Sequence, residues 1–87
     1  MKFTVIWTSA AERDLAAIWL GASDRNAVSL AANRIDRLLK GNPNAVGEIR
    51  FDSVRTLLDR PLGVDYDVSE HDRLVYVLSV WASSKSS

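Results

Sequence analysis

The strongest constraint on the fold is a strict alternation of side chains in the second half of the chain. In the segment VDYDVS, residues 64–69, apolar residues occupy the even positions, and aspartate or serine occupies the odd positions. Successive side chains of a strand point to opposite faces, so this pattern predicts a strand with one buried and one open face. Residues 73–81 follow as a second strand that is apolar on both faces. Together the two segments predict an antiparallel hairpin.

The length of the turn decides which side chains of this hairpin share a face. A three-residue turn, residues 70–72, directs three cross-strand pairs into the core. These pairs are Val68–Leu74, Tyr66–Tyr76 and Val64–Leu78. A two-residue turn would bury aspartates, which is unfavourable unless they are paired. We therefore predict the three-residue turn. It leaves the following residues on the open face: Asp65, Asp67, Ser69, Arg73, Val75, Val77, Ser79 and Trp81.

Helical periodicity predicts two helices in the first half of the chain. The first spans residues 9–21 and begins at Ser9, which stands three positions before Glu12 in the spacing of a capping box. The second spans residues 24–40 and stops at Gly41-Asn42-Pro43. Because few residues join them, we expect the helices to pack as an antiparallel αα-hairpin.

Two further strands are expected, at residues 2–7 and 54–60, in addition to 63–69 and 73–81. The element order is therefore βααβββ. It predicts an α+β fold in which the helix pair packs on one face of an antiparallel sheet.

Composition bounds the classes of function. The 87 residues allow one domain, which we expect to span residues 1–82 and to be followed by a disordered serine-rich tail, 83–87. Eleven basic and eleven acidic residues cancel, which is unlike a dedicated nucleic-acid binder. The absence of cysteine fits the cytoplasm, and no apolar run approaches the length of a membrane span. With one histidine and no cysteine, we expect no metal site and no cofactor.

Candidate catalytic residues are few. A phosphate-binding group would form if four arginines converged on one side of the sheet: Arg50, Arg55, Arg60 and Arg73. His71 is the one histidine available as a general base. The alternative, which we favour, is that each arginine pairs with a neighbouring aspartate and that the histidine is a solvated turn residue. Arg55 would then pair with Asp52 or Asp59.

The three tryptophans divide into two groups. Trp7 and Trp19 lie on apolar stripes and are expected in the core. Trp81 is predicted to form an exposed apolar strip with Val75 and Val77 on the open face, which is typical of a protein interface. The alternative is that residues 47–51 fold across this strip and cover it.

The segment VRTLLDRPLGVDYDVSEHDRLVYVLSVW, residues 54–81, resembles the C-terminal sheet of the RelE/ParE superfamily of bacterial toxins. The first strand, the segment SAAERDLAAIWL and a second helix ending in RIDRLLKGNP are similar to the rest of that fold. The resemblance covers residues 1–81 and depends on element order.

The resemblance implies the toxin of a type II toxin–antitoxin module, a plasmid stabilisation protein that inhibits growth and is neutralised by a cognate antitoxin. RelE-like members cut mRNA in the ribosomal A site, and ParE-like members inhibit DNA gyrase. The positions at which the RNases carry basic residues are occupied in this chain by Gly63, Ala82 and Ser83. We therefore expect a non-RNase, gyrase-directed or weakened toxin. The alternatives are an mRNA endonuclease using Arg50, Arg55, Arg73 and His71, or a degenerate toxin fold that acts only as an interaction module.

Overall fold

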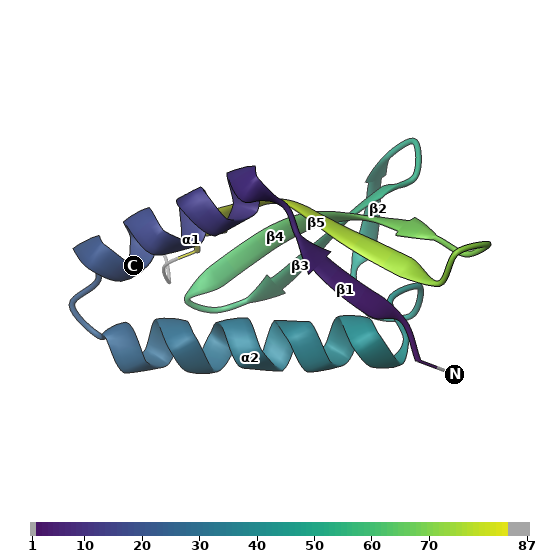
Figure 1. Ribbon diagram of the computed structural model, residues 1–87. Coiled ribbons are helices and arrows are strands. Elements are labelled where there is room, and N and C mark those ends of the chain that lie inside the picture. The colour runs from purple at the N-terminus through teal and green to yellow at the C-terminus, as the bar shows by residue number, and fades with distance from the viewer. Residues whose placement is uncertain (1, 84–87) are drawn as a thin grey trace.

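The computed structural model describes residues 2–83 (Figure 1). Two helices and five strands follow one another along the chain. Their bounds are β1 Thr4–Trp7, α1 Ser9–Gly21, α2 Arg25–Gly41, β2 Glu48–Phe51, β3 Val54–Asp59, β4 Leu62–Ser69 and β5 Leu74–Ala82. The strands form a single sheet in the order β1-β5-β4-β3-β2. The predicted α+β fold with a helix pair is confirmed.

The sheet differs from the prediction in two respects. It is mixed rather than wholly antiparallel, because β1 runs parallel to β5. It also contains β2, a four-residue strand at the edge in a region that was expected to be a loop. Local periodicity predicts which residues are extended, but it does not indicate the strand with which they pair. The parallel orientation and the short edge strand therefore had no local signal.

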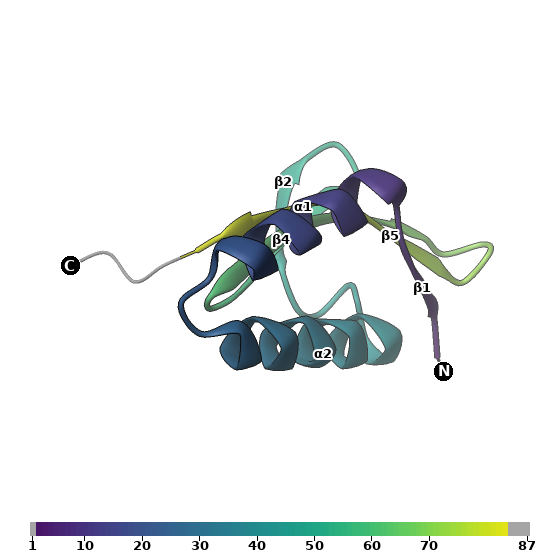
Figure 2. The same ribbon diagram turned by 60° about the vertical axis from the view of Figure 1, so that its left-hand side comes forward.

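The core lies between the sheet and the helices. Figure 2 shows α2 as a layer beneath the sheet, and α1 runs along β5. The fully buried side chains come from both helices and from the two central strands, and include Ile35, Leu39, Val64, Tyr66 and Val77. Burial of each such side chain contributes roughly 1.5–3 kcal/mol to folding. The central strands β4 and β5 thus anchor the domain.

Each helix begins at a side-chain cap. Thr8, rather than Ser9, caps α1, since its hydroxyl oxygen accepts the backbone N–H of Ala11 at 3.2 Å. Asp24 caps α2 by accepting from the N–H of Ala27 at 3.0 Å. Both caps satisfy donors that lack a partner within the first turn of a helix.

The register of the last hairpin corrects the predicted three-residue turn. Ser69 pairs with Leu74, so the turn contains four residues, 70–73, and the side chains of β5 up to residue 77 face the opposite way from the prediction. No aspartate is buried by this change, because β4 keeps its orientation and only β5 is reversed. A bulge then interrupts the pairing, and Val80 returns to the core.

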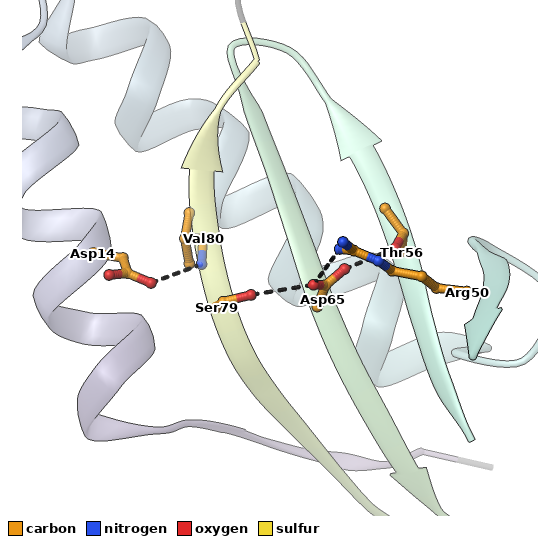
Figure 3. Close-up of polar contacts among 6 residues, drawn as sticks. All are labelled: Asp14, Arg50, Thr56, Asp65, Ser79 and Val80. Carbon is orange, nitrogen blue, oxygen red and sulfur yellow. Dashed lines mark hydrogen bonds and ion pairs between the residues drawn. The ribbon is translucent and has the colours of Figure 1, made fainter. Parts of the chain in front are cut away.

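One edge of β5 extends beyond the end of β1 and is covered by α1. The Thr8 hydroxyl donates to the carbonyl of Val77 at 2.8 Å. The carboxylate of Asp14 accepts the backbone N–H of Val80 at 3.1 Å (Figure 3). These side chains take the hydrogen-bonding positions that a longer β1 would have occupied.

The chain after β5 was expected to be a disordered tail. Ser83, its first residue, donates its backbone N–H to the carbonyl of Pro61 at 2.8 Å. Residues 84–87 lie outside the described residues. Within residues 2–83, no helix is both long and apolar enough to cross a membrane.

Candidate functional site: the open face of the sheet

The face of the sheet turned away from the helices, here called the open face, is built from rows of residues that pair across the strands. Three rows cover most of it. The first row contains Leu58, Gly63 and Trp81; the second contains Glu48, Thr56, Asp65 and Ser79; the third contains Phe51, Val54, Asp67, Tyr76 and Ile6. The second row is wholly polar, and the rows on either side of it are mainly apolar.

Asp65 stands at the centre of the open face and is held by three donors (Figure 3). The Thr56 hydroxyl donates to its carboxylate at 2.7 Å and the Ser79 hydroxyl at 3.3 Å. Arg50 reaches across β3 from the edge strand and forms an ion pair with Asp65 at 2.7 Å. The central group of this face is therefore a carboxylate that already has its hydrogen-bond partners.

The sequence placed Asp65 on this face but did not reveal the cluster around it. Thr56 belongs to a strand of mixed polarity, and Arg50 belongs to a strand that was not expected. Only the cross-strand register brings Thr56, Ser79 and Arg50 to the same carboxylate. No spacing along the chain gives that register.

Arg50 and Arg55 lie on opposite faces of the sheet. Arg55 pairs with Tyr66 on the helix side, and its guanidinium donates to the carbonyl of Asn44 at 2.7 Å. It also donates to the carbonyl of Gly47 at 3.5 Å. Arg55 therefore fixes the loop after α2 to β3. The predicted pairing of Arg55 with Asp52 or Asp59 is not found among the contacts of the described residues.

Arg73 and His71 lie in the turn between β4 and β5. Arg73 has φ of 56°, and its guanidinium stands 5.3 Å from the centre of the Phe3 ring. His71 is exposed in the same turn. The four candidate catalytic residues thus occupy three places: the open face, the helix side and the turn. The arginines therefore do not converge on one side of the sheet, which was the less favoured of the two interpretations.

The predicted apolar strip of Val75, Val77 and Trp81 is wrong for its two valines. Both are fully buried in the core, because the four-residue turn reverses this part of β5. They offer no surface to a partner on the open face. Trp81 does lie on the open face, since the bulge after Val77 restores the predicted orientation, and its ring lies over Gly63.

Gly63 provides the space that this ring occupies. A Cβ atom at position 63 would lie 2.5 Å from the Trp81 ring, closer than real Cβ contacts. The expected alternative cover for Trp81, residues 47–51, is wrong. β2 lies at the far edge of the sheet, with β3 and β4 between it and β5.

Two aromatic predictions need correction. Tyr76 was expected in the core but lies on the open face, opposite Asp67. Trp19 was also expected in the core, but 39% of its surface is exposed. It borders an apolar groove of about 480 Å³ between α1 and α2, where Arg25 stacks 4.6 Å from its ring centre. Trp7 is packed against the core as predicted, and its indole N–H donates to Asp36 at 3.1 Å.

Tyr66 links the core to the loop that Arg55 holds. Its hydroxyl donates to the carbonyl of Pro43 at 2.7 Å. Burial raises the pKa of the Tyr66 phenol, and the neighbouring Arg55 guanidinium opposes this shift. The described residues contain no group of three or more histidine, cysteine, aspartate or glutamate side chains placed to hold a metal ion.

No protein-family model matches this chain. No curated protein sequence matches it either. Several solved structures do. A chain of the toxin–antitoxin complex RelBE2 from Mycobacterium tuberculosis superposes with a TM-score of 0.76 at 20% identity, over 94% of this chain and 99% of that chain.

A chain of the chromosomal ParDE TA system from P. aeruginosa gives a TM-score of 0.64 at 22% identity, over 95% of this chain and 98% of that one. The isolated E. coli RelE toxin gives 0.68 at 14% identity, over 97% and 87%. The matches cover nearly the whole length of each chain, and they include both RelE and ParE proteins. This chain therefore has the fold of the RelE/ParE toxins.

Proposed function

We propose that this chain is the toxin of a type II toxin–antitoxin module, neutralised by a cognate protein antitoxin, and that it does not cleave RNA. Support for the toxin role is the fold that it shares with chains of the RelBE2 and ParDE systems and with isolated RelE. Within this proposal the protein acts in the cytoplasm, where both of its potential targets lie.

The proposal that the chain does not cleave RNA depends on the carboxylate at the centre of the open face. RNA cleavage by attack of a ribose 2′-OH needs a base and cationic groups that stabilise the charged phosphate. Among the described residues of this face, Arg50 is the one cation, and Asp65 engages it at 2.7 Å. Asp65, Asp67 and Glu48 would also repel the RNA backbone. This surface is unsuited to phosphate chemistry.

The positions that resemblance assigns to the basic residues of the RNases support the same conclusion. Gly63 is buried beneath the Trp81 ring, and Ala82 ends β5 with no polar group in its side chain. We therefore favour a gyrase-directed toxin that acts by binding. The alternatives are an mRNA endonuclease and an interaction module that has lost toxicity.

To test this proposal, the chain is expressed in bacteria with and without the product of the neighbouring open reading frame. Growth arrest by the chain alone, relieved by its neighbour, supports the toxin role; the absence of both effects contradicts it. Purified protein is then added to DNA gyrase in a supercoiling assay and to ribosomes carrying mRNA. We expect inhibition of supercoiling and no new RNA 5′ ends.

Cleavage by the wild-type chain would contradict the proposed mechanism. The matched variants separate its possible sources. Arg50→Ala removes the one cation of the open face, and Arg37→Ala removes an exposed cation from α2 on the other side of the molecule. Loss of cleavage in the first variant alone would establish an endonuclease that uses the open face.

A further inference from the structure

The charges of the open face do not balance. Among its described residues, the open face carries three carboxylates, those of Glu48, Asp65 and Asp67. Its one cation among them is Arg50. Arg50 compensates Asp65. Glu48 and Asp67 have no ion-pair or hydrogen-bond partner among the side-chain contacts of residues 2–83. The face therefore favours a partner that carries positive charge.

The rows on either side of the second row are mainly apolar, although the third row also contains Asp67. Leu58, in the first row, exposes 58% of its surface. In the third row Phe51 exposes 55% and Ile6 exposes 37%. Trp81 and Tyr76 add partly exposed aromatic rings to the same two rows. Groups of exposed apolar side chains mark surfaces that bind another protein.

The spacing of the rows limits what can cover them. Neighbouring rows are two residues apart along a strand, so they are separated by about 6.6 Å and the two apolar rows by about 13 Å. In a helix, residues i, i+4 and i+8 lie on one side and span about 12 Å. A helix aligned with the strands thus places one side chain on each row.

An extended segment would match the same distances through residues i, i+2 and i+4. Unlike a helix, however, it forms no hydrogen bonds between its own backbone N–H and C=O groups. Its backbone N–H and C=O groups would lie over the middle of a sheet whose own groups are already paired. A helix satisfies its backbone internally, and helices pack readily on the faces of sheets.

We propose that the open face binds an amphipathic helix of the antitoxin that carries a basic side chain between two apolar ones, at positions i, i+4 and i+8. The basic side chain lies over the second row, which contains Glu48, on the side of that row that faces Asp67 in the third row. The apolar side chains contact Trp81 in the first row and Tyr76 in the third. This inference depends on the proposed function, because it specifies the chemistry of the partner that the proposal requires.

The experiment measures binding of the full chain to the product of the neighbouring open reading frame by calorimetry. The test variant combines Glu48→Gln with Asp67→Asn, which removes both uncompensated charges with little change of shape. The control variant combines Glu12→Gln with Asp24→Asn on the helices, where asparagine caps a helix as well as aspartate does. Both variants lose two negative charges.

We expect the test variant to bind about tenfold or more weakly and the control within about twofold of wild type. The affinity of the wild-type chain should fall as salt is added, and that of the test variant should fall less steeply. Circular dichroism establishes that each variant is folded. Replacing the central basic residue of the partner helix by glutamate should abolish binding to wild type, and Asp67→Lys should partly restore it.

Equal affinities of the test variant and wild type would overturn the proposal of a cationic helix and leave the proposed toxin function intact. So would a preference of the open face for an acidic helix. If the neighbouring product neither binds the wild-type chain nor relieves its effect on growth, the proposed function itself fails, and this inference fails with it.

Discussion

Trp81 is the one residue of the predicted apolar strip that lies on the open face, and the reason is local. The bulge in β5 adds one residue between the segment that pairs with Tyr66 and the segment that pairs with Gly63. The apolar character of β5 on both faces gave no indication of this bulge. The apolar run therefore identified the strand correctly, but it did not determine which of its valines are buried. β4 was oriented correctly because its aspartates cannot be buried without partners.

Trp81→Ala should weaken binding of the proposed antitoxin while the chain stays folded. Truncation of a central aromatic anchor at an interface removes about 2 kcal/mol or more, which corresponds to roughly 30-fold in affinity. Calorimetry with the purified partner measures the change, and Trp19→Ala, in the groove between the helices, is the matched control. A melting temperature that collapses while affinity is unchanged would show that Trp81 serves the core.

The buried phenol of Tyr66 predicts a loss of stability in alkaline solution. Its pKa is raised in the folded protein by burial, whereas in the unfolded chain it ionises near pH 10. Ionisation therefore favours the unfolded state first, and the free energy of unfolding falls as the pH rises above about 10. Urea titrations between about pH 8 and pH 11 should give a flatter dependence for Tyr66→Phe. An equal slope in the variant would assign the effect to other groups.

At the scale of elements, the helices were predicted closely and the strand partners were not. α1 spans Ser9–Gly21, as predicted, and α2 begins and ends one residue beyond the prediction. Helix periodicity and caps are local signals, which a single segment contains in full. β2 is a four-residue strand whose pairing with β3 depends on the turn between them, so no comparable signal exists within the segment itself.

Thr8→Ala should lower the free energy of unfolding by about 0.5–2 kcal/mol, the usual effect of losing an N-cap. The same change frees the carbonyl of Val77, which now accepts from the Thr8 hydroxyl at 2.8 Å. Ser9→Ala is the control, because Ser9 is exposed inside the first turn. Chemical denaturation of both variants distinguishes the observed cap from the predicted one. A larger loss in Ser9→Ala would contradict the structure.

At the scale of the whole molecule, the balance of charge conceals an uneven distribution. The net charge is zero over the sequence, yet the open face carries three carboxylates and one guanidinium among its described residues. Composition alone argued only against nucleic-acid binding. The arrangement of these charges, which needed the fold, is what argues for a cationic protein partner.

The predicted domain boundary at residue 82 leads to a comparison of two truncations. Removal of residues 84–87 should leave the melting temperature unchanged, because the core residues and the contact between Ser83 and Pro61 are all retained. Removal of residues 74–87 should abolish cooperative unfolding, since β5 is bonded to both β1 and β4. Thermal melts followed by circular dichroism make the comparison. A melting temperature that falls on the shorter truncation would move the boundary.

The parallel pairing of β1 with β5 determines when this protein can fold during synthesis. Thr8 and Val77, which bond to each other where the two strands meet, are 69 positions apart. Contacts of such high sequence separation form late and slowly. During translation, β1 and both helices are synthesised before β5, so they cannot complete the core until β5 is available. The open face is therefore absent until β5 has been synthesised, and a partner that recognises this face binds only after β5 has joined the sheet.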